Sequence, residues 1–223
     1  MSGYILPILL AGVLGIASGC SVVQSSPEIP VVQTEARTAP EPVKGEQTAV
    51  FAGGCFWGVE GVFEHVNGVV DARSGYAGGT KETADYETVS SGKTGHAESV
   101  QVRFNPDVVS YRQLLEVFFS VAHDPTQLNY QGPDHGPQYR SAIFYTNDSQ
   151  REAAAAYTEE LTRSDVFHDT IVTQVVPLEA FYPAESYHQN YMKRYPTDRY
   201  IVYNDAPKVA ALKEKYPALY VEK

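Results

Sequence analysis

The sequence predicts an α+β fold: a two-layer sandwich in which a mixed, largely antiparallel sheet packs against flanking helices. Segments with strand character alternate with segments with helix character from residue 48 onward. The clearest strand, Glu98 to Phe104, alternates apolar and polar residues, which is typical of a half-buried strand and not of a parallel sheet buried on both faces. Residues 48–223 are even in composition, and their length suits one domain with its own core.

The first predicted strand and helix meet at Gly53 and Gly54. A β-prone apolar run at 49–51 precedes these glycines, and apolar residues at helical spacing follow them from Val59 to Val66. Glycines at such a junction allow a tight turn or a close approach of the backbone. Cys55 is therefore expected in the first turn of a helix.

The remaining elements follow from caps, periodicity and breakers. Ser110 is expected to cap a helix that ends at Ala122, and a long loop rich in Gly and Pro covers 123–139. Then come a strand at 141–145, a helix at 149–163 capped by Asn147 or Asp148, a strand at 171–176, and a helix at 185–194 stopped by Pro196. A loop as long as 123–139 is usually functional in a compact domain.

The N-terminal residues predict export. Residues 1–20 carry no charged side chain, include an apolar stretch from Ile5 to Ile16, and end in small residues before Cys20. The apolar stretch is too short for a membrane span and is typical of a secretory signal. The pattern resembles a bacterial lipoprotein signal, which implies lipidation of Cys20 and anchoring in the cell envelope. An uncleaved N-terminal anchor is the alternative.

Residues 21–47 are predicted to form a disordered tether. They are rich in Pro, Val, Ser, Thr, Gln and Glu, and they contain no aromatic residue. The formal net charge of the whole chain is −10, which argues against nucleic acid as a partner. We expect a monomer.

Cys55 is the candidate nucleophile. Cys20 is the only other cysteine, and an exported domain that depended on disulfides would contain more of them. Backbone N–H groups and the helix dipole stabilise negative charge at a helix start, so we expect a lowered pKa for the Cys55 thiol. A buried structural role is the ordinary alternative for a single cysteine.

Several short motifs resemble those of the A-type peptide methionine sulfoxide reductases. The most specific are Gly-Cys-Phe-Trp-Gly at 54–58, Thr-Gly-His-Ala-Glu at 94–98 and Gln-Tyr-Arg-Ser at 138–141. Ser-Gly-Tyr-Ala-Gly-Gly at 74–79 belongs to the same set, and the resemblance extends over nearly all of 48–197. It implies a ferredoxin-like sheet and the repair of methionine sulfoxide in proteins.

The resemblance also implies a role for each site residue. Cys55 attacks the sulfur of the S epimer, the oxygen leaves as water after protonation, and a sulfenic acid remains on the cysteine. Glu98 protonates the sulfoxide oxygen, and its pKa should be raised beside an apolar pocket. The substrate-binding residues are the S-methyl wall Phe56 and Trp57, the oxygen-holding phenols Tyr86 and Tyr139, and the supporting groups Asp134 and Tyr191.

No cofactor or metal is expected. His96, His135 and His188 lie in the motif segments, but the chain has no Cys-x-x-Cys or His-Glu-x-x-His pattern. His188 is expected to orient its neighbours through hydrogen bonds. Residues 56–223 contain no cysteine, so the sulfenic acid is expected to need an external thiol reductant, such as a thioredoxin-like protein.

Two other functions fit part of the sequence. A Cys-His acyl-transfer hydrolase would need an imidazole beside Cys55. A non-enzymatic surface lipoprotein could use the aromatic residues to capture methionine side chains, and it would not depend on the Cys55 sulfur.

Overall fold

The computed structural model describes residues 45–223. The predicted signal segment with Cys20, and the predicted tether as far as residue 44, lie outside this range. Their assignment therefore stays a prediction from the sequence. Gln47, the last residue of the predicted tether, instead begins a strand and pairs with Phe104, so the tether prediction is wrong at this end.

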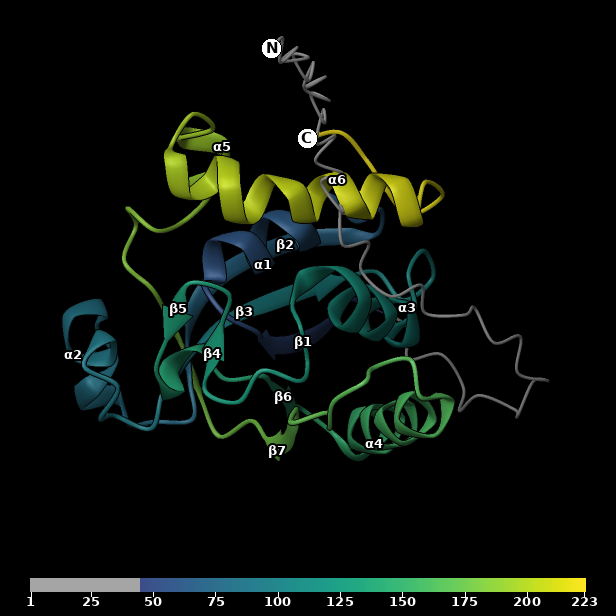
Figure 1. Cartoon of the computed structure of the whole chain (residues 1–223), viewed down its shortest axis with the longest axis horizontal. Helices are drawn as coiled ribbons and strands as arrows, with labels where there is room; N and C mark the ends of the chain where they lie inside the picture. Colours follow the sequence, from purple (N-terminus) through teal and green to yellow (C-terminus); the bar gives the residue numbers. More distant parts are fainter. Residues whose placement is uncertain (1–44) are drawn as a thin grey trace, which may run out of the picture.

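A six-stranded sheet forms the centre of the domain, in the order β7-β6-β1-β3-β2-β8 (Figure 1). The strands are β1 (Gln47–Ala52), β2 (Val69–Ala77), β3 (Ala97–Phe104), β6 (Ala142–Tyr145), β7 (Gln174–Pro177) and β8 (Phe181–Pro183). All neighbouring pairs are antiparallel except β6 with β7. The predicted mixed, largely antiparallel sheet with flanking helices is confirmed. A separate short hairpin, β4 (Tyr130–Gln131) and β5 (Asp134–His135), lies in the long loop.

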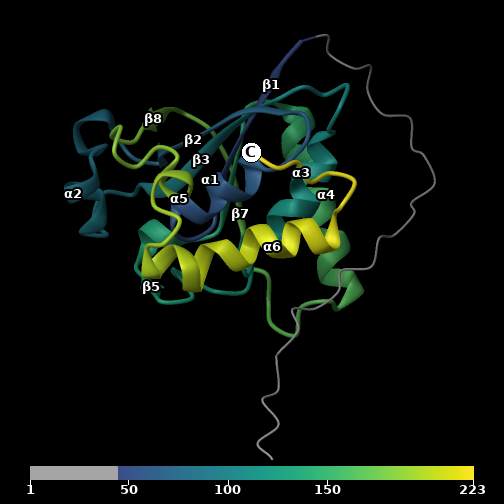
Figure 2. The same ribbon diagram turned by 90° about the horizontal axis from the view of Figure 1, so that it is seen from above.

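Helices pack around this sheet. They are α1 (Phe56–Glu64), α2 (Tyr86–Ser90), α3 (Tyr111–Val117), α4 (Asp148–Ser164), α5 (Tyr191–Arg194) and α6 (Ala206–Lys215). Helix α1 packs on β2 and β3, and α4 packs on β6 and β7. Helix α6 covers the outer side of α1, as the two perpendicular views make clear (Figure 1, Figure 2). The C-terminal segment therefore approaches the start of α1, where Cys55 lies.

Strand β1 divides the core because its side chains alternate between the two faces of the sheet. Phe51 faces the larger core beneath the helices, whereas Val50 faces a smaller cluster on the opposite side. The Phe51 ring is fully buried and stacks on Phe63 at 5.0 Å and on Phe118 at 4.9 Å between ring centroids. This stacking fixes the strand that leads directly into Cys55.

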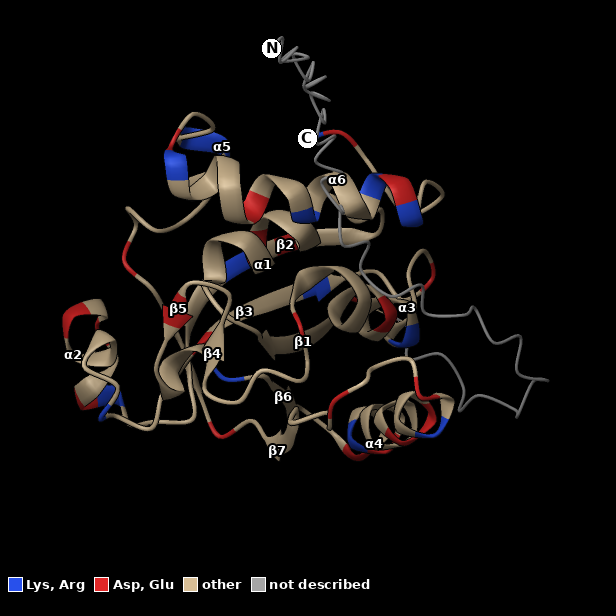
Figure 3. Ribbon diagram, in the orientation of Figure 1, with Lys and Arg blue, Asp and Glu red and all other residues tan. Residues whose placement is uncertain are grey.

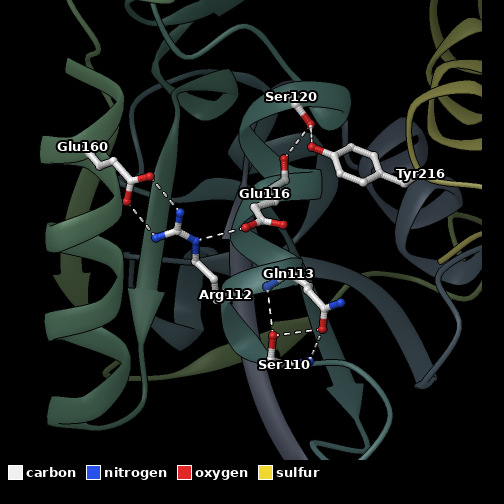
Figure 4. Close-up of polar contacts among 7 residues, drawn as sticks. All are labelled: Ser110, Arg112, Gln113, Glu116, Ser120, Glu160 and Tyr216. Atoms are coloured by element: carbon white, nitrogen blue, oxygen red, sulfur yellow. Dashed lines mark hydrogen bonds and ion pairs between the residues drawn. The ribbon is translucent and has the colours of Figure 1, made fainter. Parts of the chain in front are cut away.

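Helices α3 and α4 are joined by Arg112 (Figure 4). Its guanidinium donates two parallel hydrogen bonds of 2.9 Å to the Glu160 carboxylate and one of 3.1 Å to Glu116. The guanidinium also lies 4.0 Å from the centre of the Tyr157 ring. Ser110 caps α3 with a reciprocal capping box to Gln113, so this predicted cap is confirmed. Bidentate pairing gives the α3 to α4 contact a defined geometry.

Several elements differ from the sequence prediction, most of them in the C-terminal half. The predicted helix at 185–194 is wrong for most of its length, since only Tyr191–Arg194 is helical and Asn190 has a left-handed backbone with φ 53°. The backbone N–H of Asn190 donates to the buried Glu60 carboxylate at 3.0 Å, so this residue is bound to α1 through a long-range contact and the helix begins only after it. Strands β2 and β8 and helix α6 had no counterpart in the prediction, and β7 begins later than expected.

Charged residues gather on the outer helices and loops, and the central strands carry few of them (Figure 3). Strands β1, β6, β7 and β8 contain none, so a buried carboxylate within the sheet, such as Glu98, is exceptional. Within residues 45–223, no helix combines the length and apolar character that a bilayer span requires.

Candidate active site

Cys55 lies at the turn between β1 and α1, as the sequence predicts. It occupies the N-cap position of α1 and is 8% exposed. Gly54 makes the turn possible, because its φ is +86° and a Cβ there would lie 2.5 Å from the Gln131 side chain. The Gly54 N–H donates to the Tyr139 carbonyl at 3.2 Å. This hydrogen bond connects the turn to the long loop at 123–139, which the sequence predicts to be functional.

Glu98 reaches the same turn from the second residue of β3. Its side chain is 3% exposed, and its Oε2 atom accepts a hydrogen bond of 3.1 Å from the Phe56 N–H. Burial raises the pKa of Glu98 to about 8, with Asp134 and Asp205 adding to the rise and the Phe56 N–H opposing it. The expected rise is confirmed, and Glu98 is largely protonated at neutral pH.

The charge state of Cys55 differs from the sequence expectation. Burial raises the pKa of the Cys55 thiol, and the carboxylates of Glu98 and Asp205 raise it further. The Trp57 backbone amide and Lys208 lower it, but they do not outweigh burial. The prediction of a lowered pKa is therefore wrong for the free protein. It considered only the helix start, whereas one of the first helical N–H groups binds Glu98 and the surroundings exclude water.

Tyr86 and Tyr139 converge on Cys55 and Glu98 from separate segments. Tyr86 begins α2, and Tyr139 ends a 3₁₀ turn in the long loop. Burial raises the pKa of both phenols, and the charges of Glu98 and Cys55 raise them further. Both hydroxyls therefore stay protonated and can donate hydrogen bonds near the thiol.

Phe56 and Trp57 form an aromatic wall at the start of α1. Phe56 is buried, and Trp57 is half-buried. The indole N–H of Trp57 donates to His188 Nδ1 at 3.1 Å, and its ring stacks on Tyr191 at 3.7 Å with an interplanar angle of 6°. The predicted orienting role of His188 matches this hydrogen bond. Trp57 is thus held in one orientation from two sides.

Tyr191 and Asp134 occupy different surroundings. The Tyr191 hydroxyl donates to Asp198 at 3.4 Å, so this residue contributes chiefly its ring face to Trp57. Asp134 instead accepts a hydrogen bond from Tyr200, whose ring meets Trp57 edge-on at 5.8 Å between ring centroids. No motif in the sequence distinguishes Tyr200 from the other tyrosines of the chain, so it was not among the predicted site residues.

The histidines do not form a Cys-His pair. His123 lies against the turn, since a Cβ on Gly53 would approach its ring to 2.7 Å. Burial lowers the pKa of His123 to about 4, and its two ring nitrogens contact the Phe118 carbonyl and the Ser141 hydroxyl. Across the described part of the chain, no histidine is hydrogen-bonded to Cys55, and no group of three or more His, Cys, Asp or Glu is arranged to hold a metal ion.

A cavity of about 290 Å³ lies elsewhere, between the end of α1 and the C-terminal helices. Its lining includes His65, Met192, Lys193 and Tyr220 and none of the predicted site residues. The chemistry-bearing side chains are therefore separate from this cavity.

The chain resembles proteins of one known family over most of its length. Residues 47–219 match the family model described as peptide methionine sulfoxide reductase. Peptide methionine sulfoxide reductase MsrA 2 of Mesorhizobium japonicum is 58% identical over 179 residues, which cover 80% of this chain and 92% of the relative. The MsrA 2 protein of a Synechocystis species is 51% identical over 173 residues, covering 78% and 81%.

Two solved structures resemble the domain. The reduced form of Mxr1 from Saccharomyces cerevisiae aligns with a TM-score of 0.64 and 38% identity, covering 68% of this chain and 87% of that one. Methionine sulfoxide reductase A of Corynebacterium diphtheriae aligns with a TM-score of 0.60 and 34% identity, covering 69% and 77%. The chain belongs to the peptide methionine sulfoxide reductase family.

Proposed function

We propose that Cys55 carries the reaction of this oxidoreductase, which reduces methionine sulfoxide at the expense of an external thiol. One observation supports the assignment most directly. A buried thiol, a buried carboxylic acid and two phenols converge from four separate segments of the chain, at Cys55, Glu98, Tyr86 and Tyr139. A nucleophile beside a proton donor and hydroxyl donors is what a sulfoxide needs.

The substrate sulfoxide binds with its S-methyl group against Phe56 and Trp57. A methyl group forms no hydrogen bond, but it gains free energy from burial against aromatic faces. The sulfoxide oxygen then points to Glu98 and to the Tyr86 and Tyr139 hydroxyls. Because the sulfur centre is chiral, a pocket that fixes both the methyl group and the oxygen accepts one epimer, which we assign as S. Asp134, Tyr200 and Tyr191 support this wall through their contacts with one another and with Trp57.

The reaction has two stages: oxygen transfer to Cys55, and then reduction of Cys55 by an external thiol. The Cys55 sulfur attacks the substrate sulfur while Glu98 protonates the oxygen, and after loss and return of water the products are the thioether and a Cys55 sulfenic acid. The net change is the transfer of one oxygen atom from the sulfoxide to the Cys55 thiol. One external thiol then forms a mixed disulfide with release of water, and a second restores Cys55 and leaves as the oxidised disulfide. Residues 56–223 supply no thiol for these steps, and a thioredoxin-like protein is the proposed donor.

Cys55→Ser tests this proposal. We expect the full-length chain to reduce S-methionine sulfoxide peptides with dithiothreitol, and Cys55→Ser to give no measurable turnover, because a hydroxyl is a far weaker nucleophile. Mass spectrometry after one equivalent of substrate, without reductant, should find a sulfenic acid at Cys55 in the parent. Tyr203→Phe, which changes an exposed side chain, is the matched control. Full activity in Cys55→Ser would refute the assignment, and amide or ester cleavage would favour a hydrolase instead.

The location of the enzyme is a second proposal. Residues 1–20 support an exported lipoprotein, anchored through Cys20 and joined to the domain by the segment 21–47, with the domain acting as a monomer in the cell envelope. Expression in a bacterial host followed by intact-mass measurement of the membrane fraction tests this. A diacylglycerol-modified Cys20 is expected, and the Cys20→Ser variant should carry no lipid. An unmodified N-terminus in the parent would contradict it.

A further inference from the structure

Asp205 and Lys208 form an ion pair against the first turn of α1. Asp205 ends a π-helical turn (Ile201–Asp205), and Lys208 lies in the first turn of α6. The Lys208 ammonium donates to Asp205 Oδ1 at 3.1 Å. A Cβ on Gly58 would lie 2.1 Å from Asp205 Oδ1 and 2.8 Å from Lys208 Nζ. Gly58 therefore leaves the space that the pair occupies.

The pair packs on the helical turn that Cys55 begins. Gly58 is the third helical residue after the N-cap Cys55, so Asp205 and Lys208 contact the first turn of α1. Asp205 is 0% exposed, and its Oδ2 atom has no hydrogen-bond partner among the described residues. The Lys208 side chain is 20% exposed, so its ammonium is also largely removed from water.

A half-satisfied buried carboxylate is costly for folding. Burying an ion costs several kcal/mol after relaxation, and a single partner does not fully compensate it. The core offers no packing reason for a carboxylate at this position, since an apolar residue would fill the same volume without that cost. Buried ionisable groups next to a nucleophile are the usual means by which proteins adjust its charge.

Few charged groups face Cys55. Glu98 approaches from β3, and Asp205 and Lys208 approach from the C-terminal segment. The other titratable neighbours are phenols that stay neutral: Tyr86, Tyr139, Tyr191 and Tyr200. Glu98 is largely protonated at neutral pH. Burial also raises the pKa of Asp205, but the adjacent Lys208 ammonium opposes that rise, so Asp205 and Lys208 are the charged pair that remains. Lys208 is the cation that lowers the pKa of the Cys55 thiol.

We propose that Lys208 and Asp205 are positioning residues that set the thiolate fraction of Cys55 in opposite directions. The Lys208 ammonium stabilises the thiolate, Asp205 holds this ammonium at the start of α1, and the Asp205 charge disfavours the thiolate. The pair keeps a buried thiol protonated at rest while leaving a counter-charge beside it for the attack. This role rests on the proposed function of Cys55 as the nucleophile.

The test compares two substitutions of opposite sign. In a full-length Cys20→Ser background, Cys55 is the only thiol, and its alkylation rate by iodoacetamide is measured against pH. At a fixed pH below the midpoint, Lys208→Met should slow alkylation by about threefold to tenfold, and Asp205→Asn should accelerate it by a similar factor. Lys208→Arg should restore the parent rate. Lys213→Met, which changes an exposed lysine further along the same helix, should leave the alkylation rate unchanged.

The outcomes separate a charge role from a packing role. If Asp205 and Lys208 only hold α6 on α1, both substitutions should change alkylation in the same direction, and that result would overturn the proposal, as would no change in either. Should Asp205→Asn fail to fold, Lys208→Met against Lys208→Arg decides alone. Alkylation does not depend on sulfoxide reduction, so failure of this proposal is distinct from failure of the proposed function.

Discussion

Replacing Glu98 with glutamine should lower the rate of sulfoxide reduction by about 10²- to 10⁴-fold, the range expected when a positioned general acid is lost. Glutamine keeps a carbonyl oxygen that can accept the Phe56 N–H, so the start of α1 should keep its geometry. It cannot release a proton to the developing oxyanion at a useful rate. The measurement is single-turnover formation of methionine from an S-sulfoxide peptide.

The pH dependence of the same reaction gives a second readout. The folded pKa of Glu98 is raised to about 8, so the protonated acid predominates below this pH and is lost as pH rises through it. The parent rate should therefore decline above about pH 8, and this decline should be absent in Glu98→Gln. Glu87→Gln, an exposed residue of α2, is the control. Retention of the parent rate within about threefold would exclude Glu98 as the acid.

Replacing Phe51 with alanine should lower the free energy of unfolding by about 3–5 kcal/mol. The ring is fully buried and stacks on Phe63, Phe118 and Tyr111, so its removal leaves a cavity that three rings must close. A domain of this kind has a total stability of about 5–15 kcal/mol, so this loss is a large part of it. Urea unfolding followed by circular dichroism measures the change.

Val108→Ala is the comparison for this prediction. Val108 is 47% exposed, and its substitution should stay within about 0.5 kcal/mol of the parent. If Phe51→Ala does not fold, Phe51→Leu keeps most of the volume and should still be measurably less stable. A loss below about 1 kcal/mol for Phe51→Ala would mean that the aromatic stack does not hold β1 in place.

The elements that could be predicted well are those marked by a short sequence pattern of their own, such as an apolar run, an alternation or a helix cap. The β-prone run before Gly53, the alternation from Glu98 to Phe104 and the caps Ser110 and Asn147 each identify an element within a few residues. Strand β2 lacks such a signal, because its last four residues are all buried and include Ser74 and Gly75. Its pairing with β3 and β8 is what makes it a strand.

The residues of the candidate site likewise fall into two groups: those that a sequence motif identifies, and those that only the fold brings to the site. One motif contains the three neighbouring residues Cys55, Phe56 and Trp57, so their proposed roles could be predicted from the sequence. Tyr200 is brought to Asp134 only when the C-terminal segment folds over α1. Asp205 reaches Cys55 by the same route, and no spacing in the sequence indicates it.

The sequence by itself determined the candidate reactive group, its place at a strand to helix turn, and the family to which the chain belongs. Only the tertiary structure decided the charge of that group. A helix start favours a thiolate, but burial and two carboxylates raise the pKa of Cys55, and one of the first helical N–H groups binds Glu98 instead. The physical reason is that hydrogen-bonding pattern and periodicity are local, whereas desolvation and Coulomb interactions depend on every segment that packs around the sulfur.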